Sequence, residues 1–471
     1  MKKQLTRQLF KWLFTVTTGL IIWLIPVPEG LSVQAWHLFA IFVGTVTGII
    51  ARPLPMGTIA LLGIVSTILT GTLTINESLS GFGNKVIWLV VTAFFISRGF
   101  IKTGLGTRIA YIFISFFGKK SLGLAYGFIA TDLVLAPAIP SNTARGGGII
   151  FPIIRSTSET YHSDPENNSS RKIGSFLIFS SFQSLNITSA MFLTAMAANP
   201  LIAELASGLG VNLNWGNWAL AALLPGLISL VIIPLFIYYL YPPEIKETPD
   251  AAVLAKEKLS KMGKMKFNEW ILLCTFFLLL FLWIFGPYIK LDSTTVALTG
   301  LGILLITKVL TWDDILKEKG AWTTLVWYAS LVMMATFLTT LGFIPWFAEN
   351  VKNMVADSNW IAAFIILSLV YFYSHYLLAS NTAHVSSMYL PFLTVAIATG
   401  APPVLAALVL GFFSSLFSSM THYGTGPAPV FFGSGYVEMD TWWKLGFYIS
   451  IINIIVWIGI GGIWWKTLGL W

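Results

Sequence analysis

The sequence S-N-T-A-R-G-G-G-I-I-F-P, residues 141–152, returns in altered form as S-N-T-A-H-V-S-S-M-Y-L-P at residues 380–391. The offset between the two copies is 239 residues, and it holds for Ser, Asn, Thr, Ala, the basic residue and the final proline. A weaker echo places K-T-G-L at 102–105 against T-L-G-F at 340–343. The chain is therefore predicted to contain two related halves.

The composition around these motifs is that of a membrane protein. Of 471 residues, 56% are hydrophobic and only 10% are charged, whereas a soluble domain uses about a quarter of its residues as Asp, Glu, Lys and Arg. The 19 tryptophans suit rings that gather at the two membrane interfaces. We interpret the net charge of +8 as basic cytoplasmic loops, not as a nucleic-acid-binding surface.

The apolar runs predict the number of membrane spans. A span needs about 20 mostly apolar residues. Eleven runs qualify, near 9–26, 33–51, 56–72, 86–116, 173–200, 217–241, 269–288, 294–310, 321–343, 403–430 and 444–467. Two further apolar segments, near 122–155 and 359–400, are broken by the polar tripeptides and by prolines, and they are predicted to be re-entrant helical hairpins.

The distribution of basic residues predicts the orientation in the membrane. With the N-terminus inside, the predicted cytoplasmic segments hold 20 of the 28 Lys and Arg residues, the opposite side holds 4, and 4 remain near or within membrane segments. This bias predicts a cytoplasmic N-terminus and an external C-terminus. The basic N-terminal segment leads directly into an apolar run, so we expect a first span and not a cleaved signal. A bacterial plasma membrane is the expected location.

This layout predicts three parts and an inverted arrangement. Residues 1–243 form the first half, with six spans and a hairpin entering from the cytoplasmic side, and residues 269–471 form the second half, with five spans and a hairpin entering from the outer side. Residues 244–268, which mix lysines with acids, are predicted to be a solvated cytoplasmic linker. Hairpins from opposite sides are the arrangement by which many secondary transporters place a substrate at mid-membrane.

The residue types of each S-N-T tripeptide suit an anion. Ser and Thr hydroxyls and the Asn amide can donate hydrogen bonds to carboxylate oxygens, and the N-terminus of the following helix also favours negative charge. Two facing tips fit a molecule with a carboxylate at each end. The alternative is that these residues hold helices together, as polar residues often do in membranes; their matched repetition favours binding.

The basic residue two places after each Thr adds a further hypothesis. Arg145 and His384 occupy equivalent positions, and an ionisable group deep in a membrane is costly and often functional. We expect them to offset the charge of a bound anion. The alternatives are that Arg145 pairs with Asp132, which is itself more readily an ion-pair partner than a proton carrier, and that His384 is a satisfied core histidine.

Two polar segments follow the hairpins, at Ser181–Ser189 and Ser418–Pro429. Glycine and proline in the second segment predict an unwound helix with exposed backbone groups. Asn186, Thr188 and Thr425 are therefore further candidates for substrate binding. Cys274 is the only cysteine, which excludes a cysteine metal cluster, and no cofactor or metal site is expected.

The chain resembles the divalent anion/sodium symporter family. Its P-V-P-E-G-L-S-V-Q-A-W-H-L-F-A-I-F-V-G-T at 26–45, P-L-P-M-G-T-I-A-L-L-G at 53–63 and I-P-S-N-T-A-R-G-G-G-I at 139–149 are similar to the branch of plastid 2-oxoglutarate/malate translocators and bacterial dicarboxylate or citrate/succinate exchangers. The resemblance implies a homodimer that works as an elevator, with a static scaffold and a mobile transport domain. It also implies substrate binding by Ser141, Asn142, Thr143, Ser380, Asn381 and Thr382, and by Thr425.

The sequence departs from the sodium-coupled members of that family. Those members have small or hydroxyl residues where this chain has Arg145 and His384, and they carry a G-T-P-P-N-like motif where it has A-A-N-P at 197–200 and G-T-G-P-A-P at 424–429. The expected function is sodium-independent, obligatory exchange of dicarboxylates of the 2-oxoglutarate, malate, succinate and fumarate class, because a fixed charge cannot leave with the substrate. The main alternative is a sodium-coupled di- or tricarboxylate symporter.

Two other classes fit the sequence less well. Paired hairpins around one binding locus argue against an anion channel. The absence of paired carboxylates, of metal-ligand spacing and of a Ser–His–Asp set argues against an enzyme.

Overall fold

The computed structural model of the protein describes residues 2–354 and 359–471, and every regular element in these ranges is a helix. Up to the linker the main helices are α1 Lys2–Leu24, α2 Val33–Ala51, α3 Met56–Leu69, α4 Ile75–Leu79, α5 Lys85–Thr103, α6 Leu105–Phe117, α7 Ser121–Leu135, α8 Asn142–Arg145, α9 Phe151–Thr160, α10 Gly174–Met191, α11 Ala198–Ser207, α12 Trp215–Leu240 and α13 Pro249–Met262. After it come α14 Phe267–Phe285, α15 Ser293–Ile306, α16 Trp312–Lys317, α17 Lys319–Thr340, α18 Phe343–Met354, α19 Trp360–Tyr373, α20 Asn381–His384, α21 Leu390–Ala398, α22 Pro403–Leu416, α23 Ala428–Gly433, α24 Met439–Ile454 and α25 Gly461–Thr467.

The helices confirm the prediction of an all-α, multi-pass membrane protein. Within the described residues, seven helices are long and apolar enough to cross a membrane, and several shorter apolar helices accompany them. Three predicted spans are interrupted. The run 86–116 is divided between α5 and α6, the run 173–200 between α10 and α11, and the run 403–430 between α22 and α23. Hydropathy does not detect the first two breaks, because the residues on both sides of each are apolar. The third break confirms the prediction that glycine and proline unwind the polar segment Ser418–Pro429.

Matched local signals confirm that the two halves are related. Gly104 ends α5 with φ +79°, and Gly342 follows α17 with φ +90°, so the glycine shared by K-T-G-L and T-L-G-F has the same left-handed backbone in both halves. Thr74 and Thr311 each form a capping box at the start of a short helix, α4 and α16. The halves therefore share helix order and helix boundaries as well as the S-N-T motif.

The two hairpins enter from opposite ends of α12, whose 26 residues span about 39 Å. The base of the first hairpin lies near the C-terminal end of α12, because the N–H of Ser121, at the start of α7, donates to the carbonyl of Lys246, shortly after α12 ends. The base of the second hairpin lies near the other end, because Trp360 packs against Trp471 and the adjacent α25 bonds the start of α12. The hairpins are therefore inverted with respect to each other, as the repeat predicts.

The predicted linker is more ordered than expected. Residues 249–262 form α13, whose Ala251, Ala252 and Ala255 are buried on the side that packs against α6. Arg108 of α6 donates to both carboxylate oxygens of Glu269 in α14, at 2.7 and 3.2 Å, and to the carbonyl of Gly263. The alternation of small apolar and charged residues forms an amphipathic helix that covers its neighbour.

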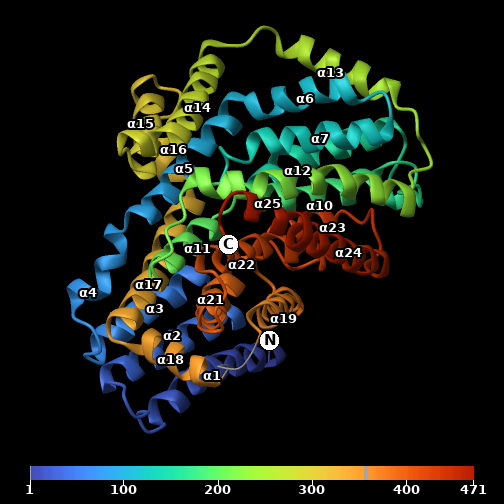
Figure 1. Ribbon diagram of the computed structural model, residues 1–471. Helices are drawn as coiled ribbons and strands as arrows, with labels where there is room; N and C mark the ends of the chain where they lie inside the picture. Colours follow the sequence, from blue (N-terminus) through green and yellow to red (C-terminus); the bar gives the residue numbers. More distant parts are fainter. Residues whose placement is uncertain (1, 355–358) are drawn as a thin grey trace.

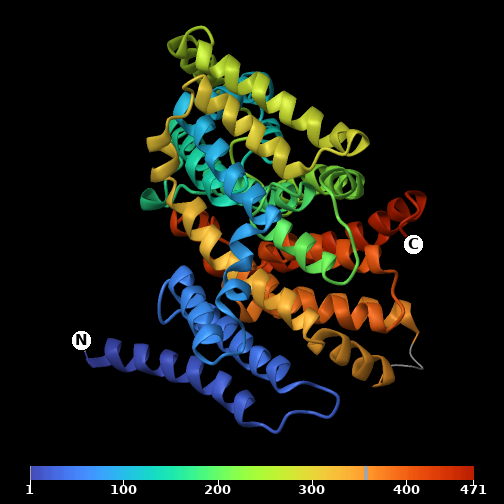
Figure 2. The ribbon, with the colours of Figure 1, turned by 90° about the vertical axis from the view of Figure 1, so that its left-hand side faces the viewer.

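The helices form two packed groups. The first contains α1–α5 and α14–α17, and the second contains the hairpins, α10, α12 and α22–α25. Figure 1 shows α3, α5 and α14 on the left and α12, α23 and α24 on the right, and Figure 2 shows the N-terminal helices and α13 at opposite ends of the molecule. Helix α11 reaches across and packs against both α5 and α17, so the interruption after α10 lies close to the boundary between the groups.

The left-handed glycine at the end of α17 gives a first test. Gly342 (φ +90°) and Gly302, inside α15, both have open space where the β-carbon of an alanine would lie, so replacement by alanine isolates the backbone effect. We expect Gly342→Ala to lose about 1–2 kcal/mol through left-handed strain, whereas Gly302→Ala should gain up to about 1 kcal/mol of helix propensity. The measurement is the thermal unfolding midpoint of each purified variant; equal midpoints would contradict the assigned conformation.

Candidate functional site

Each S-N-T tripeptide begins a helix at the tip of its hairpin. Ser141 caps α8 and accepts a hydrogen bond from the N–H of Ala144 at 3.1 Å, and Ser380 caps α20 and accepts from the N–H of Ala383 at 3.4 Å. In both serine residues the extended backbone ends the preceding loop and starts the helix, as N-cap residues do. The O–H of each serine remains available to donate to a ligand.

The backbone after both tips departs from α-helix in the same way. Residues 146–150 and 385–389 form single π-helical turns, followed by Pro152 and Pro391 at matched positions. A proline inside a helix lacks an N–H and clashes with the carbonyl four residues before it, so the backbone widens there. Such π-helical turns often occur at functional sites, and here the repeat places one behind each tip.

The two Asn side chains connect both tips to one segment, residues 414–425. Asn142 donates to the Thr425 hydroxyl at 2.9 Å, and Asn381 donates to the Ser418 hydroxyl at 2.5 Å and to the Ser414 carbonyl at 3.1 Å. Both Asn residues are buried. The structure thus brings the first tip together with the interruption of the second half, and in this conformation both amides position the tips instead of facing solvent.

The remaining hydroxyls form the accessible surface of the site. Thr143 is exposed and Thr382 is half-buried, and Gly426 lies so close to Thr143 that a β-carbon there would overlap the hydroxyl. Because Thr425 accepts from Asn142, its own O–H is free to donate. The nearest carboxylate described at the first tip, Asp132, is already paired, so the surface presents donors suited to an anion.

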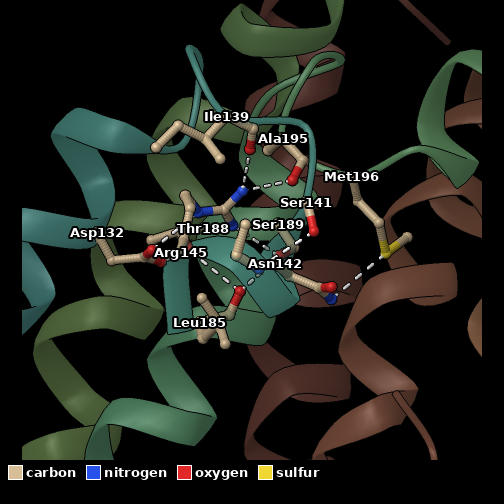
Figure 3. Close-up of polar contacts among 11 residues, drawn as sticks. Asp132, Ile139, Ser141, Asn142, Arg145, Leu185, Thr188, Ser189, Ala195 and Met196 are labelled. Atoms are coloured by element: carbon tan, nitrogen blue, oxygen red, sulfur yellow. Dashed lines mark hydrogen bonds and ion pairs between the residues drawn. The ribbon is translucent and has the colours of Figure 1, made fainter. Parts of the chain in front are cut away.

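Arg145 is fully buried in a network of its own (Figure 3). Its Nε donates to Asp132 at 2.9 Å, one terminal nitrogen donates to the carbonyls of Ile139 at 2.7 Å and Ala195 at 2.5 Å, and the other donates to Ser189 at 3.0 Å. Asn142 extends away from this network towards Met196. The ion-pair interpretation of Asp132 is confirmed, and Arg145 does not present an unpaired charge to a bound anion.

His384 lies in a second buried network. Its Nδ1 is 3.0 Å from Nδ1 of His375, and Nε2 of His375 is 2.9 Å from the carbonyl of Gly424. Neither imidazole has exposed surface. Like Arg145, His384 is held inside the hairpin and does not contact the exposed face of the tip. Sequence reasoning missed His375, because nothing in its spacing of nine residues before His384 marks a contact.

Both networks contain a hydrogen bond from a basic side chain of the hairpin to a carbonyl of the unwound backbone. The interruption between α10 and α11 spans residues 192–197, and its Ala195 carbonyl is bonded by Arg145. The interruption between the second-half helices spans residues 420–427, and its Gly424 carbonyl is bonded by His375. In each half a basic side chain of the hairpin takes a carbonyl of the unwound backbone.

Two of the further candidates for substrate binding, Thr188 and Asn186, have other partners. Thr188 donates to the second oxygen of Asp132, so it belongs to the Arg145 network. Asn186 is buried and donates to the carbonyl of Phe182 within its own helix. Neither side chain reaches the exposed face of the tips in this conformation, because the polar segment 181–189 folds as a continuous part of α10 and only residues 192–197 unwind.

Comparison with known proteins agrees with this architecture. Residues 6–471 match the family model of the sodium:sulfate symporter transmembrane region. The chain is 62% identical over 470 residues to YflS of Bacillus subtilis, described as a candidate malate transporter, and covers 98% of it with 100% of its own length. It is 51% identical over 462 residues to dicarboxylate transporter 1, chloroplastic, of Spinacia oleracea, with 98% of this chain and 81% of that protein covered.

A more distant relative and a solved structure extend the comparison. The chain is 39% identical over 473 residues to inner membrane protein YbhI of Escherichia coli, with 99% of each chain covered. The YdaH transporter of Alcanivorax borkumensis has a similar fold, with a TM-score of 0.57 and 10% identity over 98% of both chains. The matches confirm the resemblance on which the sequence interpretation rests and the prediction of a membrane transporter, not an enzyme.

The buried pair at the first tip gives a second test. We expect Arg145→Met to cost about 3–5 kcal/mol of stability, because it leaves Asp132 buried and unpaired. The double variant Arg145→Met/Asp132→Leu should recover part of this loss, though not the hydrogen bonds to Ile139 and Ala195. The measurement is a double-mutant cycle of thermal stability.

A second Arg–carboxylate pair in the same hairpin supplies the control. Arg155 and Glu159 are 3.1 Å apart and largely exposed, so Arg155→Met should cost less than about 1 kcal/mol. If Arg145→Met were no more harmful than Arg155→Met, the buried network would not hold the tip.

Proposed function

The chain belongs to the sodium:sulfate symporter family, that of the divalent anion/sodium symporters, and from this premise we propose that it exchanges small dicarboxylates across a bacterial plasma membrane without sodium. The substrate class is that of 2-oxoglutarate, malate, succinate and fumarate. The observation that carries the proposal is the pair of capped S-N-T tips joined through one segment, residues 414–425. The names of the relatives from Bacillus subtilis and Spinacia oleracea agree with this class.

The available donors support a dicarboxylate. Ser141 and Thr143 of the first tip, and Ser380 and Thr382 of the second, can each donate through a hydroxyl, and Thr425 contacts Asn142 of the first tip. The first two N–H groups of each tip helix add to these donors at the positive end of the helix dipole. Two separate sets of donors match a carboxylate at each end of a short carbon chain better than a single carboxylate.

Two backbone carbonyls that already accept hydrogen bonds from the protein support sodium independence. Unwound backbone carbonyls are the groups that coordinate sodium in many secondary transporters. Here the Arg145 guanidinium already bonds the Ala195 carbonyl, and His375 already bonds the Gly424 carbonyl. In each interruption, one carbonyl that a coupling ion would need is therefore bonded by an N–H group of the protein. Unlike a sodium ion, this N–H group cannot leave with the substrate.

The unsatisfied donors of the empty site support obligatory exchange. Because Asp132 offsets the charge of Arg145, an uncompensated cation cannot be the reason that the empty carrier returns slowly. An empty carrier would instead have to bury the free hydroxyls and N–H groups of both tips against the apolar surface of the other helix group. Each unsatisfied group costs about 1–3 kcal/mol, and a total of ~4 kcal/mol slows the return about a thousandfold.

The proposed motion and assembly follow from the two groups of helices. The group that holds both hairpins would move as a transport domain against the group of α1–α5 and α14–α17, in an elevator mechanism, and the latter would form the contact between two copies in a homodimer. Lys102 pairs with Asp314 and Lys85 pairs with Asp292, which agrees with the proposed sides of the loops. The proposed orientation is N-terminus inside and C-terminus outside.

A sodium-coupled symporter is the second candidate. The specific observation in its favour is the family description itself, together with the presence of an interruption in each half. It keeps the same tips and the same substrate class, and differs only in what accompanies the substrate.

Transport by proteoliposomes tests the proposal. Labelled 2-oxoglutarate should enter vesicles preloaded with malate and should not enter empty vesicles, because only the loaded carrier crosses readily. Replacing sodium with choline should leave this uptake unchanged. Uptake into empty vesicles that requires a sodium gradient would support the symporter instead, and passive flux without counter-substrate would support a channel.

A further inference from the structure

The contact between His375 and His384 requires a particular arrangement of protons. Nε2 of His375 faces the carbonyl of Gly424 at 2.9 Å, and a carbonyl can only accept, so this nitrogen carries a hydrogen. In the neutral ring Nδ1 of His375 is then an acceptor. The hydrogen of the 3.0 Å Nδ1–Nδ1 contact therefore belongs to His384, which leaves Nε2 of His384 with a free lone pair.

This arrangement can accept a single proton without losing a contact. Nε2 of His384 lies 3.4 Å from the hydroxyl of Ser374. This hydroxyl donates to the carbonyl of Tyr371 at 2.8 Å, so its oxygen can accept from a new N–H on His384. Protonation at this nitrogen keeps the Nδ1–Nδ1 hydrogen bond and the bond to Gly424. A second proton on Nδ1 of His375 would place two N–H groups against each other, so the pair holds one positive charge at most.

The surroundings favour that charge electrostatically while burial opposes it. The ring of Phe417 stacks on both imidazoles, with centroid distances of 3.8 Å to His375 and 4.4 Å to His384, and an aromatic face attracts a cation. Both histidines are fully buried, and burial disfavours a charged group without a counter-ion. Whether the pair carries a proton therefore depends on a negative charge nearby.

The groups packed around the pair do not supply that negative charge. Tyr371 of α19 lies 4.7 Å from His384 between ring centroids, with its hydroxyl bonded to Ser414. Two other helices pack around the tip and the π-helical turn after it. Helix α2 contributes His37, which stacks on Trp23, and α11 contributes Glu204, which accepts from Asn84. Helix α22 contributes no titratable group, and Tyr389 of the turn donates to the Ala407 carbonyl. In the described residues, no carboxylate lies within ion-pair distance of either imidazole.

We propose that His375 and His384 form a proton site that fills when a dicarboxylate binds, so that the carrier takes up a proton together with its anionic substrate. The inference rests on the proposed function, which places the anion at the tips. Gly424 is adjacent to Thr425, and His384 is two residues after Thr382, so the pair lies directly behind both the tip and the interruption. The bound anion supplies the missing counter-charge, and by linkage the proton strengthens anion binding equally.

Proton uptake during binding tests this site. The full-length protein, purified in detergent, would be titrated calorimetrically with 2-oxoglutarate in buffers that differ in ionisation enthalpy, which gives the number of protons taken up per ligand bound. We expect uptake of up to about one proton per protomer at a pH where the empty pair is uncharged and the anion-bound pair is charged. The affinity should rise by up to about tenfold for each unit that the pH falls within the window in which the pair titrates.

Two variants separate titration from structure. His375→Gln keeps an N–H for the Gly424 carbonyl but cannot be protonated, and His384→Asn keeps a group at the Nδ1 position. His384→Asn removes the nitrogen that takes the proton, so it should abolish the proton uptake and flatten the pH dependence of binding. His375→Gln keeps Nε2 of His384 and removes only its neighbouring imidazole, so it should reduce the uptake. The exposed His162 follows α9, at the base of the other hairpin, so His162→Gln should leave the uptake unchanged.

The outcomes distinguish this inference from the proposed function. Binding of 2-oxoglutarate by the unmodified protein with no proton uptake between about pH 5.5 and 8 would overturn the proton site and leave the dicarboxylate site intact. Uptake that persists in His384→Asn would also overturn it. Failure of any dicarboxylate of the proposed class to bind would overturn the proposed function and this inference together.

Discussion

The architecture depends on how an unwound backbone is satisfied inside a membrane. A helix that breaks in lipid leaves N–H and carbonyl groups without partners, each at a cost of several kcal/mol. In this chain the hairpin of each half supplies a partner, with Arg145 bonding the Ala195 carbonyl and His375 bonding the Gly424 carbonyl. These contacts fix the hairpin tips against the interruptions, and the tips can then present their hydroxyls and helix N-termini to an anion.

The two halves satisfy the unwound backbone with different chemistry. Arg145 bonds its carbonyl directly, whereas in the second half His375, the neighbour of the equivalent residue His384, makes the bond. In the first half a permanently charged guanidinium is offset by Asp132, so its network is electrically balanced. In the second half two neutral imidazoles form a network that can gain one charge. The site thus combines a fixed charge pair in one half with the proposed titratable pair in the other.

Much of this could be predicted from the sequence, because the S-N-T repeat and the long apolar runs each have a direct physical meaning. The all-helical class, the two hairpins and their opposite directions followed from patterns that are visible along the chain. The break at Gly104 did not follow from such a pattern, because apolar residues on both sides of a turn look like one span. Nor did the packing of α13 on α6, because it depends on which helix lies beside α13 in the fold. The sequence offered the pairing of Arg145 with Asp132 only as one of two alternatives, and the structure confirms it. The partner of His384 could not be predicted, because side-chain partners of this kind are decided by packing and not by spacing.

In the proposed mechanism, protein N–H groups occupy the carbonyl positions that a coupling ion would use. The equilibrium affinity of the purified protein for 2-oxoglutarate, measured in sodium chloride and in choline chloride at equal ionic strength, tests this directly. The dissociation constant should be the same in both salts. A loss of more than about tenfold in affinity, about 1.4 kcal/mol, on removing sodium, reversed when sodium is restored, would contradict it.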